Sequence, residues 1–268
     1  MLKIENTEVM GLEAAIRGMR NPMNSWEQSD SVRCHKDLMR DCVTCVHRGT
    51  DYSACMAGAF DVGSNDLDLM TRLRNAGTDH RKFMRMITVS LDITAPLYWW
   101  KEFDTYKVGT VANSCSTMHK IAAKEFTPED FSHEHLLSMA NNDAGDALFL
   151  NDANNIRVDG DDLLGLTINV LNYYRGRYIK TKDKRYWWQL IQLLPSSYNQ
   201  RRTVMLNYEV LANIYKSRRN HKLDEWHTFC DWIESLPYSE LICGLLWDYR
   251  CEPLKLAMSM EDAKKEVE

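Results

Sequence analysis

The segment from Ile87 to Phe103 decides the fold, and it reads "ITVSLDITAPLYWWKEF". Apolar and polar residues alternate from Ile87 to Thr94, which is the period of a strand with one buried face. Pro96 then suits the first turn of a helix, where its missing N–H removes no hydrogen bond. The pattern predicts a strand over Met86–Thr94, followed at once by an aromatic helix.

Most of the remaining chain has the period of a helix. "TPED" at Thr127–Asp130 is a typical helix start, with a Thr cap, a Pro inside it and acidic residues in the first turn. One strand among many helices predicts an α+β fold with a small central sheet packed by helices. The other predicted helices are Met10–Arg20, Asp66–Asn75 (closed by Gly77), Leu163–Tyr178, Lys184–Leu193, Arg202–Arg218, Asp224–Glu234 and Ser239–Tyr249.

Composition narrows the class of protein. The 268 residues carry a net charge of −5, so no general polyanion surface is expected and duplex nucleic acid is not an expected partner. No segment approaches the roughly 18 consecutive apolar residues of a membrane helix, and "MLKIENTEVM" lacks the apolar core of a signal peptide. We therefore expect a cytoplasmic protein, with residues 1–268 forming a single domain.

A cysteine-rich insertion at about residues 30–60 stands apart from this pattern. Cys34, Cys42, Cys45 and Cys55 have enough soft ligands for one tetrahedral zinc ion. The alternative is a loop with incidental thiols, since zinc modules usually pair two closely spaced cysteine motifs. The sequence leaves both interpretations open.

Two other groups of residues have a functional and a structural interpretation. His133 and His135 lie two apart in a predicted helix, so they point away from each other and are expected to be surface residues rather than metal ligands. Tyr173–Tyr178 ("YYRGRY") and Lys182–Trp188 ("KDKRYWW") interleave bases with aromatic rings. Such segments can stack nucleic-acid bases, or can form a core stripe beside a solvated basic face.

The predicted helix Arg202–Arg218 is rich in polar groups. Asn207 and Arg218 lie eleven residues apart, so they share one edge of a helix, whereas Asn213 lies about 120° around from Asn207. A polar ligand shared between subunits would satisfy such groups if they were buried. A solvated helix needs no ligand, and spacing alone does not decide between the two.

These segments together resemble the flavin-dependent thymidylate synthase family over roughly residues 65–235. The strand ending in "AP", the aromatic helix, "TYKVGT" and "VANSCSTMHK" follow the family order, and "LMTRLRNAGTDHRKFM" precedes the strand as in the family. The intervals from Leu194-Pro195 to Asn207, Asn213 and Arg218 also match. Thr105-Tyr106-Lys107 stands where the family has Arg-His-Arg, and Thr117 stands where it has a phosphate-binding arginine.

The resemblance implies a set of site residues. Arg218 is the implied catalytic residue, polarising the base, with the register between Arg218 and Arg219 left open. The implied cofactor-binding residues are Lys107, Asn207, Asn213 and His80. The implied substrate-binding residues are Ser114, Cys115, Ser116, Lys120, Arg201, Arg218 and Arg219.

The resemblance also implies a function. The protein that it implies is a homotetrameric flavoprotein methyltransferase of nucleotide biosynthesis, which uses FAD, methylenetetrahydrofolate and NADPH to convert dUMP to dTMP. One alternative is hydroxymethylation or methylation of dCMP or another pyrimidine nucleotide. An alternative of another class is a non-catalytic nucleotide-binding or zinc-bearing interaction protein. Bound flavin separates the enzymes from the last class.

Overall fold

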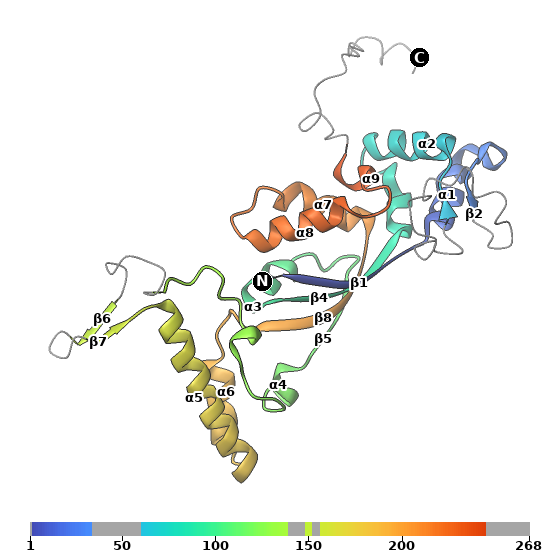
Figure 1. Cartoon of the computed structure of the whole chain (residues 1–268). Helices are drawn as coiled ribbons and strands as arrows, with labels where there is room; N and C mark the ends of the chain where they lie inside the picture. Colours follow the sequence, from blue (N-terminus) through green and yellow to red (C-terminus); the bar gives the residue numbers. More distant parts are fainter. Residues whose placement is uncertain (1, 34–59, 139–147, 152–155, 245–268) are drawn as a thin grey trace, which may run out of the picture.

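The computed structural model describes residues 2–33, 60–138, 148–151 and 156–244. Its centre is a four-stranded sheet in the order β1-β4-β8-β5, antiparallel at every pairing (Figure 1). The strands are β1 (Lys3–Met10), β4 (Thr88–Pro96), β8 (Asn199–Asn207) and β5 (Val111–Ser114). The predicted α+β class is confirmed.

The apolar alternation of β4 forms the centre of the core. Val89, Leu91 and Ile93 are at most 1% exposed, and Val204 and Leu206 of β8 lie beside them, fully buried. Against this face pack α7 (Tyr208–Arg218) and α8 (Asp224–Glu234), with α1 (Leu12–Arg20), α2 (Ser64–Asn75), η5 (Arg81–Met86) and α9 (Glu240–Cys243) at one end (Figure 1). The opposite face of the sheet carries the polar half of the alternation.

The aromatic helix α3 (Leu97–Phe103) belongs to this core. Pro96 is its N-cap, and Trp99 and Phe103 are at most 1% exposed. The ring of Trp99 lies 4.8 Å from Trp226 and 5.6 Å from Phe229 of α8, centroid to centroid. The tryptophans after the strand therefore pack α3 against α8 and belong to the core, so the polar residues that follow α3 are not needed for this packing.

Several predicted elements are confirmed, and the largest error is at β8. Helices α6 (Lys184–Leu193) and α8 have the predicted bounds, and α1, α2 and β4 differ by about two residues. The predicted helix Arg202–Arg218 is a strand up to Asn207 and a helix only from Tyr208. The "TPED" start is followed by a 3₁₀ turn, η6 (Pro128–Asp130), with the expected capping box but no α-helix.

A helical hairpin extends from the sheet (Figure 1). It consists of α5 (Gly160–Thr181) and α6, and a second apolar cluster containing Leu171 and Leu190 packs it against residues 121–131. Tyr174 and Trp187 pack on that cluster, and Arg177 and Lys184 lie over aromatic rings. These contacts favour the core-stripe interpretation of the two aromatic and basic segments. In the described part of the chain, no helix is long and apolar enough to cross a membrane.

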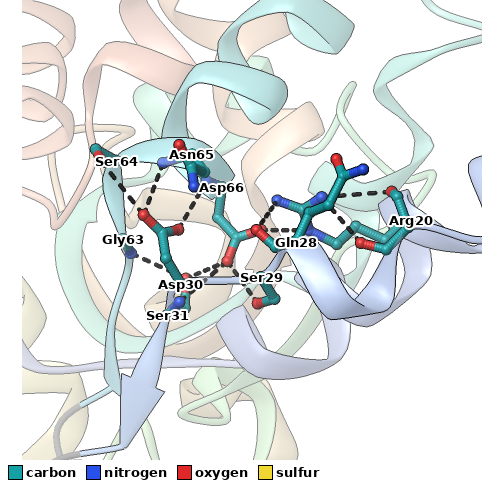
Figure 2. A network of polar contacts seen from close by, with 10 residues as sticks. Arg20, Gln28, Ser29, Asp30, Ser31, Gly63, Ser64, Asn65 and Asp66 are labelled. Carbon is teal, nitrogen blue, oxygen red and sulfur yellow. Dashed lines mark hydrogen bonds and ion pairs between the residues drawn. The ribbon is translucent and has the colours of Figure 1, made fainter.

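The base of the cysteine-rich segment is held by a buried polar network (Figure 2). Strand β2 (Val32–Arg33) pairs with β3 (Phe60–Asp61), after the short turns η1 (Asn21–Met23) and η2 (Trp26–Gln28). Cys34, Cys42, Cys45 and Cys55 lie outside the described residues.

The remaining two described strands, β6 (Leu148–Asn151) and β7 (Ile156–Val158), pair with each other.

Candidate functional site

A pocket of about 350 Å³ opens where β8 begins. It lies between the first residues of β8, the turn after β5, the short helix α4 (Thr117–Lys120) and the segment leading to η6. Its lining contains Cys115, Ser116, Lys120 and Arg201, four of the residues that the sequence predicts to bind substrate. Ser114 lies next to it on β5, paired with Arg202 of β8.

Strand β8 fixes the small polar residues that line this pocket. The N–H of Cys115 donates to the carbonyl of Arg201 at 2.9 Å, and Nε2 of the buried Gln200 donates to the carbonyl of Cys115 at 2.8 Å. Ser116 caps α4, since its Oγ accepts from the N–H of His119 at 3.0 Å. The segment "NSCST" is therefore the end of an edge strand and the start of a helix.

The cations of the pocket differ in how far they are neutralised. Lys124 pairs with Asp130, and Nη2 of Arg201 lies 2.7 Å from Oδ2 of Asp92. Hydrogen bonds from Thr203, Arg201 and Asn6 hold the pKa of Asp92 well below its usual range, so the carboxylate that pairs with Arg201 is ionised at neutral pH. Lys120 has no ion-pair partner in the described part of the chain, which makes it the cation best able to bind an anionic ligand.

Aromatic rings form the other wall. Phe126 and Tyr198 line the pocket with ring centroids 6.2 Å apart, and Asn172 holds the backbone of Phe126 through bonds of 2.9 and 2.8 Å. Burial raises the pKa of Tyr198, with a smaller contribution from Asp130, so its phenol keeps its proton at neutral pH. An apolar wall beside hydroxyls and a cation suits a phosphorylated ligand with a ring.

Arg218 lies elsewhere, in a compact cluster at the end of α7. Its Nη1 lies 2.6 Å from Oε2 of Glu102, and its Nε donates to the Tyr106 hydroxyl at 2.9 Å. The guanidinium is centred 4.8 Å from the Trp226 ring, and the side chain is 18% exposed. Arg219 instead lies over the ring of Tyr215 at 5.5 Å. Sequence reasoning missed the contacts of this cluster. Glu102 and Tyr106 lie more than a hundred residues before Arg218, and Trp226 lies more than a hundred residues after Glu102, to which it bonds.

The predicted cofactor residues gather at the far end of β8. Asn207 is the N-cap of α7, accepting from the N–H of Val210 at 3.1 Å, so it does not share a helix edge with Arg218 as predicted. Lys107 stands two residues before Gly109, where an added Cβ would lie 2.9 Å from Nδ2 of Asn207. Nη2 of Arg81 donates to Oδ1 of the exposed Asn213 at 3.4 Å.

His80 completes this group, because it is the N-cap of η5 and directly precedes Arg81. The predicted substrate residues thus include a pocket group at the start of β8, the predicted cofactor residues form a second group near its end, and Arg218 belongs to a separate cluster with Glu102 and Tyr106. The strand has nine residues, which separates its ends by about 27 Å. One chain does not bring the two groups together.

No metal site is present among the described residues, since they contain no group of three or more His, Cys, Asp or Glu side chains that could hold an ion. His133 and His135 lie outside any helix, contrary to the prediction. Nδ1 of His133 lies 2.9 Å from the carbonyl of Phe131, and His135 pairs with Asp224 at 3.2 Å. The two histidines therefore have separate partners, in keeping with their expected non-metal role.

Comparison with known proteins gives a likeness in structure. No family model and no curated protein sequence matches this chain. A flavin-dependent thymidylate synthase ThyX from Helicobacter pylori, complexed with FAD and dUMP, superimposes with a TM-score of 0.56 over 90% of this chain and 97% of its own, at 16% identity. The chain has the fold of flavin-dependent thymidylate synthase.

A second ThyX structure from the same organism, also with FAD and dUMP, gives a TM-score of 0.56 over 91% of this chain at 15% identity. The UMP/dUMP methylase PolB from Streptomyces cacaoi, bound with 5-Br UMP, gives a TM-score of 0.49 over 87% of this chain at 13% identity. The resemblance inferred from strand, helix and asparagine spacing is confirmed for the thymidylate synthase fold. At this identity the likeness does not transfer residue roles.

Proposed function

We propose that this protein is a flavin-dependent transferase that adds a one-carbon unit to C5 of a pyrimidine deoxynucleotide, with dUMP methylation to dTMP as the reference reaction. The pocket carries the proposal. It combines hydroxyls, an aromatic wall and Lys120, which has no ion-pair partner among the described residues, at the segment that the resemblance implies for the nucleotide phosphate. The ThyX structures of the same fold contain FAD and dUMP.

The nucleotide monophosphate would lie with its phosphate at Lys120 and the hydroxyls of Ser116 and Thr117, which are short donors that permit close approach. Phe126 and Tyr198 would contact the sugar and base. Arg201 is already paired with Asp92, so it contributes more to the shape of the pocket than to its charge. The thiol of the exposed Cys115 is next to the phosphate position and needs no role in this scheme.

The second group of residues fits FAD by its donor set. Lys107, His80 and Arg81 provide cationic or hydrogen-bonding groups for the pyrophosphate, and the exposed amide of Asn213 can contact the edge of the flavin ring. Flavin, when bound, supplies hydride transfer. The residues of the chain would bind and orient, and Arg218 would donate hydrogen bonds to a pyrimidine carbonyl.

The triplet Thr105-Tyr106-Lys107, which stands where the family has Arg-His-Arg, leads us to propose weak binding of FAD. Thr105 and Tyr106 carry no positive charge at neutral pH, and each charge-assisted contact to phosphate is worth roughly 1.5–3 kcal/mol. We expect FAD to be substoichiometric after purification and to rebind when added, with a further loss of affinity in Lys107→Ala. Flavin fluorescence during titration of the apoprotein measures this. The two lost contacts imply that FAD should still bind at concentrations of roughly tens of micromolar. A titration that shows no saturable binding of FAD in that range favours the non-catalytic alternative.

We propose a homotetramer, which the family resemblance implies and which a site shared between subunits would support. The pocket that contains Lys120 is lined neither by Arg218 nor by its partners Glu102 and Tyr106, so we propose that a site using both Lys120 and Arg218 draws on more than one subunit. Exposed apolar residues on paired strands, Val111 at 61% and Met205 at 38%, offer part of a subunit contact. We expect light scattering to give about four times the chain mass of 31.2 kDa. A monodisperse monomer at micromolar concentration contradicts this.

Product analysis distinguishes the nucleotide and the reaction. We propose methylenetetrahydrofolate as the one-carbon donor and NADPH as the reductant, in a cytoplasmic enzyme. A methylene unit is at the oxidation level of formaldehyde, so forming a methyl group consumes a hydride, whereas forming a hydroxymethyl group consumes none. We expect one NADPH oxidised per dTMP formed from dUMP. Hydroxymethylated product from dCMP without NADPH oxidation establishes the alternative reaction.

The cysteine-rich segment is the third place where a ligand is proposed. Cys34, Cys42, Cys45 and Cys55 remain candidates for a zinc site or for free thiols. Elemental analysis of freshly reduced protein gives about one zinc per chain in the first case. No zinc or iron leaves the loop interpretation.

A further inference from the structure

The carboxylate of Glu102 is the centre of the cluster around Arg218. Its Oε2 lies 2.6 Å from Nη1 of Arg218, accepts from Nε1 of Trp226 at 3.0 Å, and lies 3.3 Å from Nε2 of His221. The N–H of Leu223 donates to Nδ1 of His221 at 3.2 Å, so Nε2 carries the proton of the neutral ring and donates to Glu102. Glu102 therefore receives three donors from α7, α8 and the turn between them.

Tyr106 holds the other side of the guanidinium. Its hydroxyl accepts from Nε of Arg218 at 2.9 Å, and the guanidinium lies 5.6 Å from the Tyr106 ring and 4.8 Å from the Trp226 ring. Trp226 is fully buried against Trp99, so this ring is a rigid support. Tyr106 is the middle residue of the triplet that departs from the thymidylate synthase pattern, and this contact gives it a function there.

These contacts leave one nitrogen of the Arg218 guanidinium available to a ligand. Nε and Nη1 are engaged, and among the described residues Nη2 has no hydrogen-bond partner. The adjacent carboxylate of Glu102 largely cancels the positive charge. A fixed N–H donor with little net charge suits a neutral carbonyl group better than a phosphate, which is attracted by uncompensated charge.

We infer that Glu102 and Tyr106 are positioning residues that hold Arg218 as the group that reads the pyrimidine base, while Lys120 binds the phosphate. The inference rests on the proposed function, since it takes a pyrimidine nucleotide as the ligand. It deepens that function by dividing recognition between a neutralised arginine and a lysine that has no ion-pair partner in the described ranges. It also explains why a tyrosine is accepted where the related fold carries a charged triplet.

The experiment compares two ligands, dUMP and 2-deoxyribose 5-phosphate, which has the phosphate and lacks the base. Binding is measured by calorimetry for the wild type, Tyr106→Phe, Glu102→Gln and Arg218→Ala. Tyr98→Phe is the matched control, because it removes a hydroxyl from the helix that carries Glu102, and that hydroxyl bonds to the carboxylate of Glu225 rather than to Arg218. Thermal unfolding of each variant is recorded alongside.

We expect Tyr106→Phe and Glu102→Gln to weaken dUMP binding by about two- to tenfold, the effect of one lost hydrogen bond, and to leave deoxyribose 5-phosphate binding unchanged. Tyr98→Phe leaves both ligands unchanged. Tyr106→Phe combined with Arg218→Ala is no weaker than Arg218→Ala alone, because the first change acts through the arginine. A general structural defect would affect both ligands, so the ratio of the two affinities is the informative quantity.

Different outcomes overturn different statements. If Arg218→Ala weakens dUMP binding and Tyr106→Phe and Glu102→Gln do not, the positioning role is wrong and the proposed function stands. If Arg218→Ala binds dUMP as the wild type does, the base-reading role of Arg218 is wrong, and the positioning role with it. If the wild type binds neither ligand, the proposed function itself is wrong.

Discussion

Lys120 is the residue on which the phosphate part of the site depends. Its ammonium group faces the pocket without an ion-pair partner in the described ranges, whereas the neighbouring Lys124 is paired with Asp130. A contact of this kind to a phosphate is worth roughly 1.5–3 kcal/mol. We expect Lys120→Ala to weaken dUMP and deoxyribose 5-phosphate binding equally, by on the order of tenfold to a hundredfold.

Lys124→Ala is the control for this prediction and should have a smaller effect on either ligand. The wild-type affinity should also fall as salt is raised, since exposed charges are screened. Calorimetric titration at two ionic strengths measures both effects. Equal losses in the two lysine variants would show that the charge of the pocket, rather than Lys120 itself, binds the phosphate.

Asp66 is the residue that matters most for stability at the base of the cysteine-rich segment. It is fully buried and accepts from Nε of Arg20 at 2.6 Å and from the hydroxyls of Ser29 and Ser31 at 2.7 and 2.6 Å (Figure 2). Burial raises the pKa of this carboxyl, but hydrogen bonds from Ser31, Ser29 and Arg20 outweigh burial, so the pKa is lowered.

A carboxyl whose pKa is lower in the folded state stabilises the fold above its unfolded pKa of about 3.9 and loses that contribution as the pH falls through the folded pKa. We expect Asp66→Ala to cost about 3–5 kcal/mol at neutral pH, because Arg20 is left buried without its partner. The difference in unfolding free energy from the wild type should shrink below about pH 4. Urea unfolding at several pH values measures it, and a difference independent of pH argues against the ion pair.

At the scale of elements, prediction succeeded where one period holds over a whole element. The alternation of β4 and the amphipathic patterns of α6 and α8 are each uninterrupted; the bounds of the two helices follow from the sequence, and those of β4 to within two residues. Strand β8 failed because it runs into α7 with no proline or glycine between them. Val204 lies at helical spacing from Tyr208, Leu211 and Tyr215 of α7, so the strand reads as a continuation of the helix. The short edge strand β5 is exposed throughout and so has no apolar alternation.

The residues of the candidate site also divide into those that one segment supplies and those that meet only in the folded chain. The family resemblance implied Ser116 and Lys120 from one short segment, and both line the pocket, Ser116 as the cap of α4 and Lys120 as its last residue. Phe126, Tyr198 and the partners of Arg218 come from segments that meet only in the folded chain. No local pattern marks such residues, so sequence reasoning alone could not have grouped them.

The turn between α3 and β5 gives a test at this scale. Gly109 has φ of +78°, and an added Cβ would lie 2.9 Å from Nδ2 of Asn207 and 3.2 Å from Cγ2 of Val210. We expect Gly109→Ala to destabilise the fold by about 1–2 kcal/mol, the usual cost of a left-handed conformation for a residue with a side chain.

Gly165→Ala is the matched control, since Gly165 lies inside α5 with nothing within 4 Å of an added Cβ. Removing a glycine from a helix should stabilise it by roughly 0.5–1 kcal/mol. Denaturant unfolding of the two variants should therefore give changes of opposite sign. A neutral Gly109→Ala would mean that the turn and the cap of α7 are less closely packed than the structure indicates.

At the scale of the whole molecule, the separation of Lys120 from Arg218 sets the requirement for assembly. Lys120 lines the pocket at the start of β8, whereas neither Arg218 nor its partners Glu102 and Tyr106 line it, so we expect a nucleotide that contacts both Lys120 and Arg218 to lie between two subunits. This arrangement makes a prediction that does not depend on the nature of the reaction. The two residues should complement each other in trans.

We expect Lys120→Ala and Arg218→Ala, each defective alone, to regain tight dUMP sites when the two chains are unfolded and refolded as an equal mixture. With random assembly, about a quarter of the shared sites receive both wild-type residues, one from each chain. The number of tight sites is counted by calorimetry, with each variant refolded alone as the control. If the mixture has no more tight sites than the separate variants, Lys120 and Arg218 act within one chain, and the need for a second subunit disappears. If a quarter of the sites return, the nucleotide lies between a phosphate-binding subunit and a base-reading one.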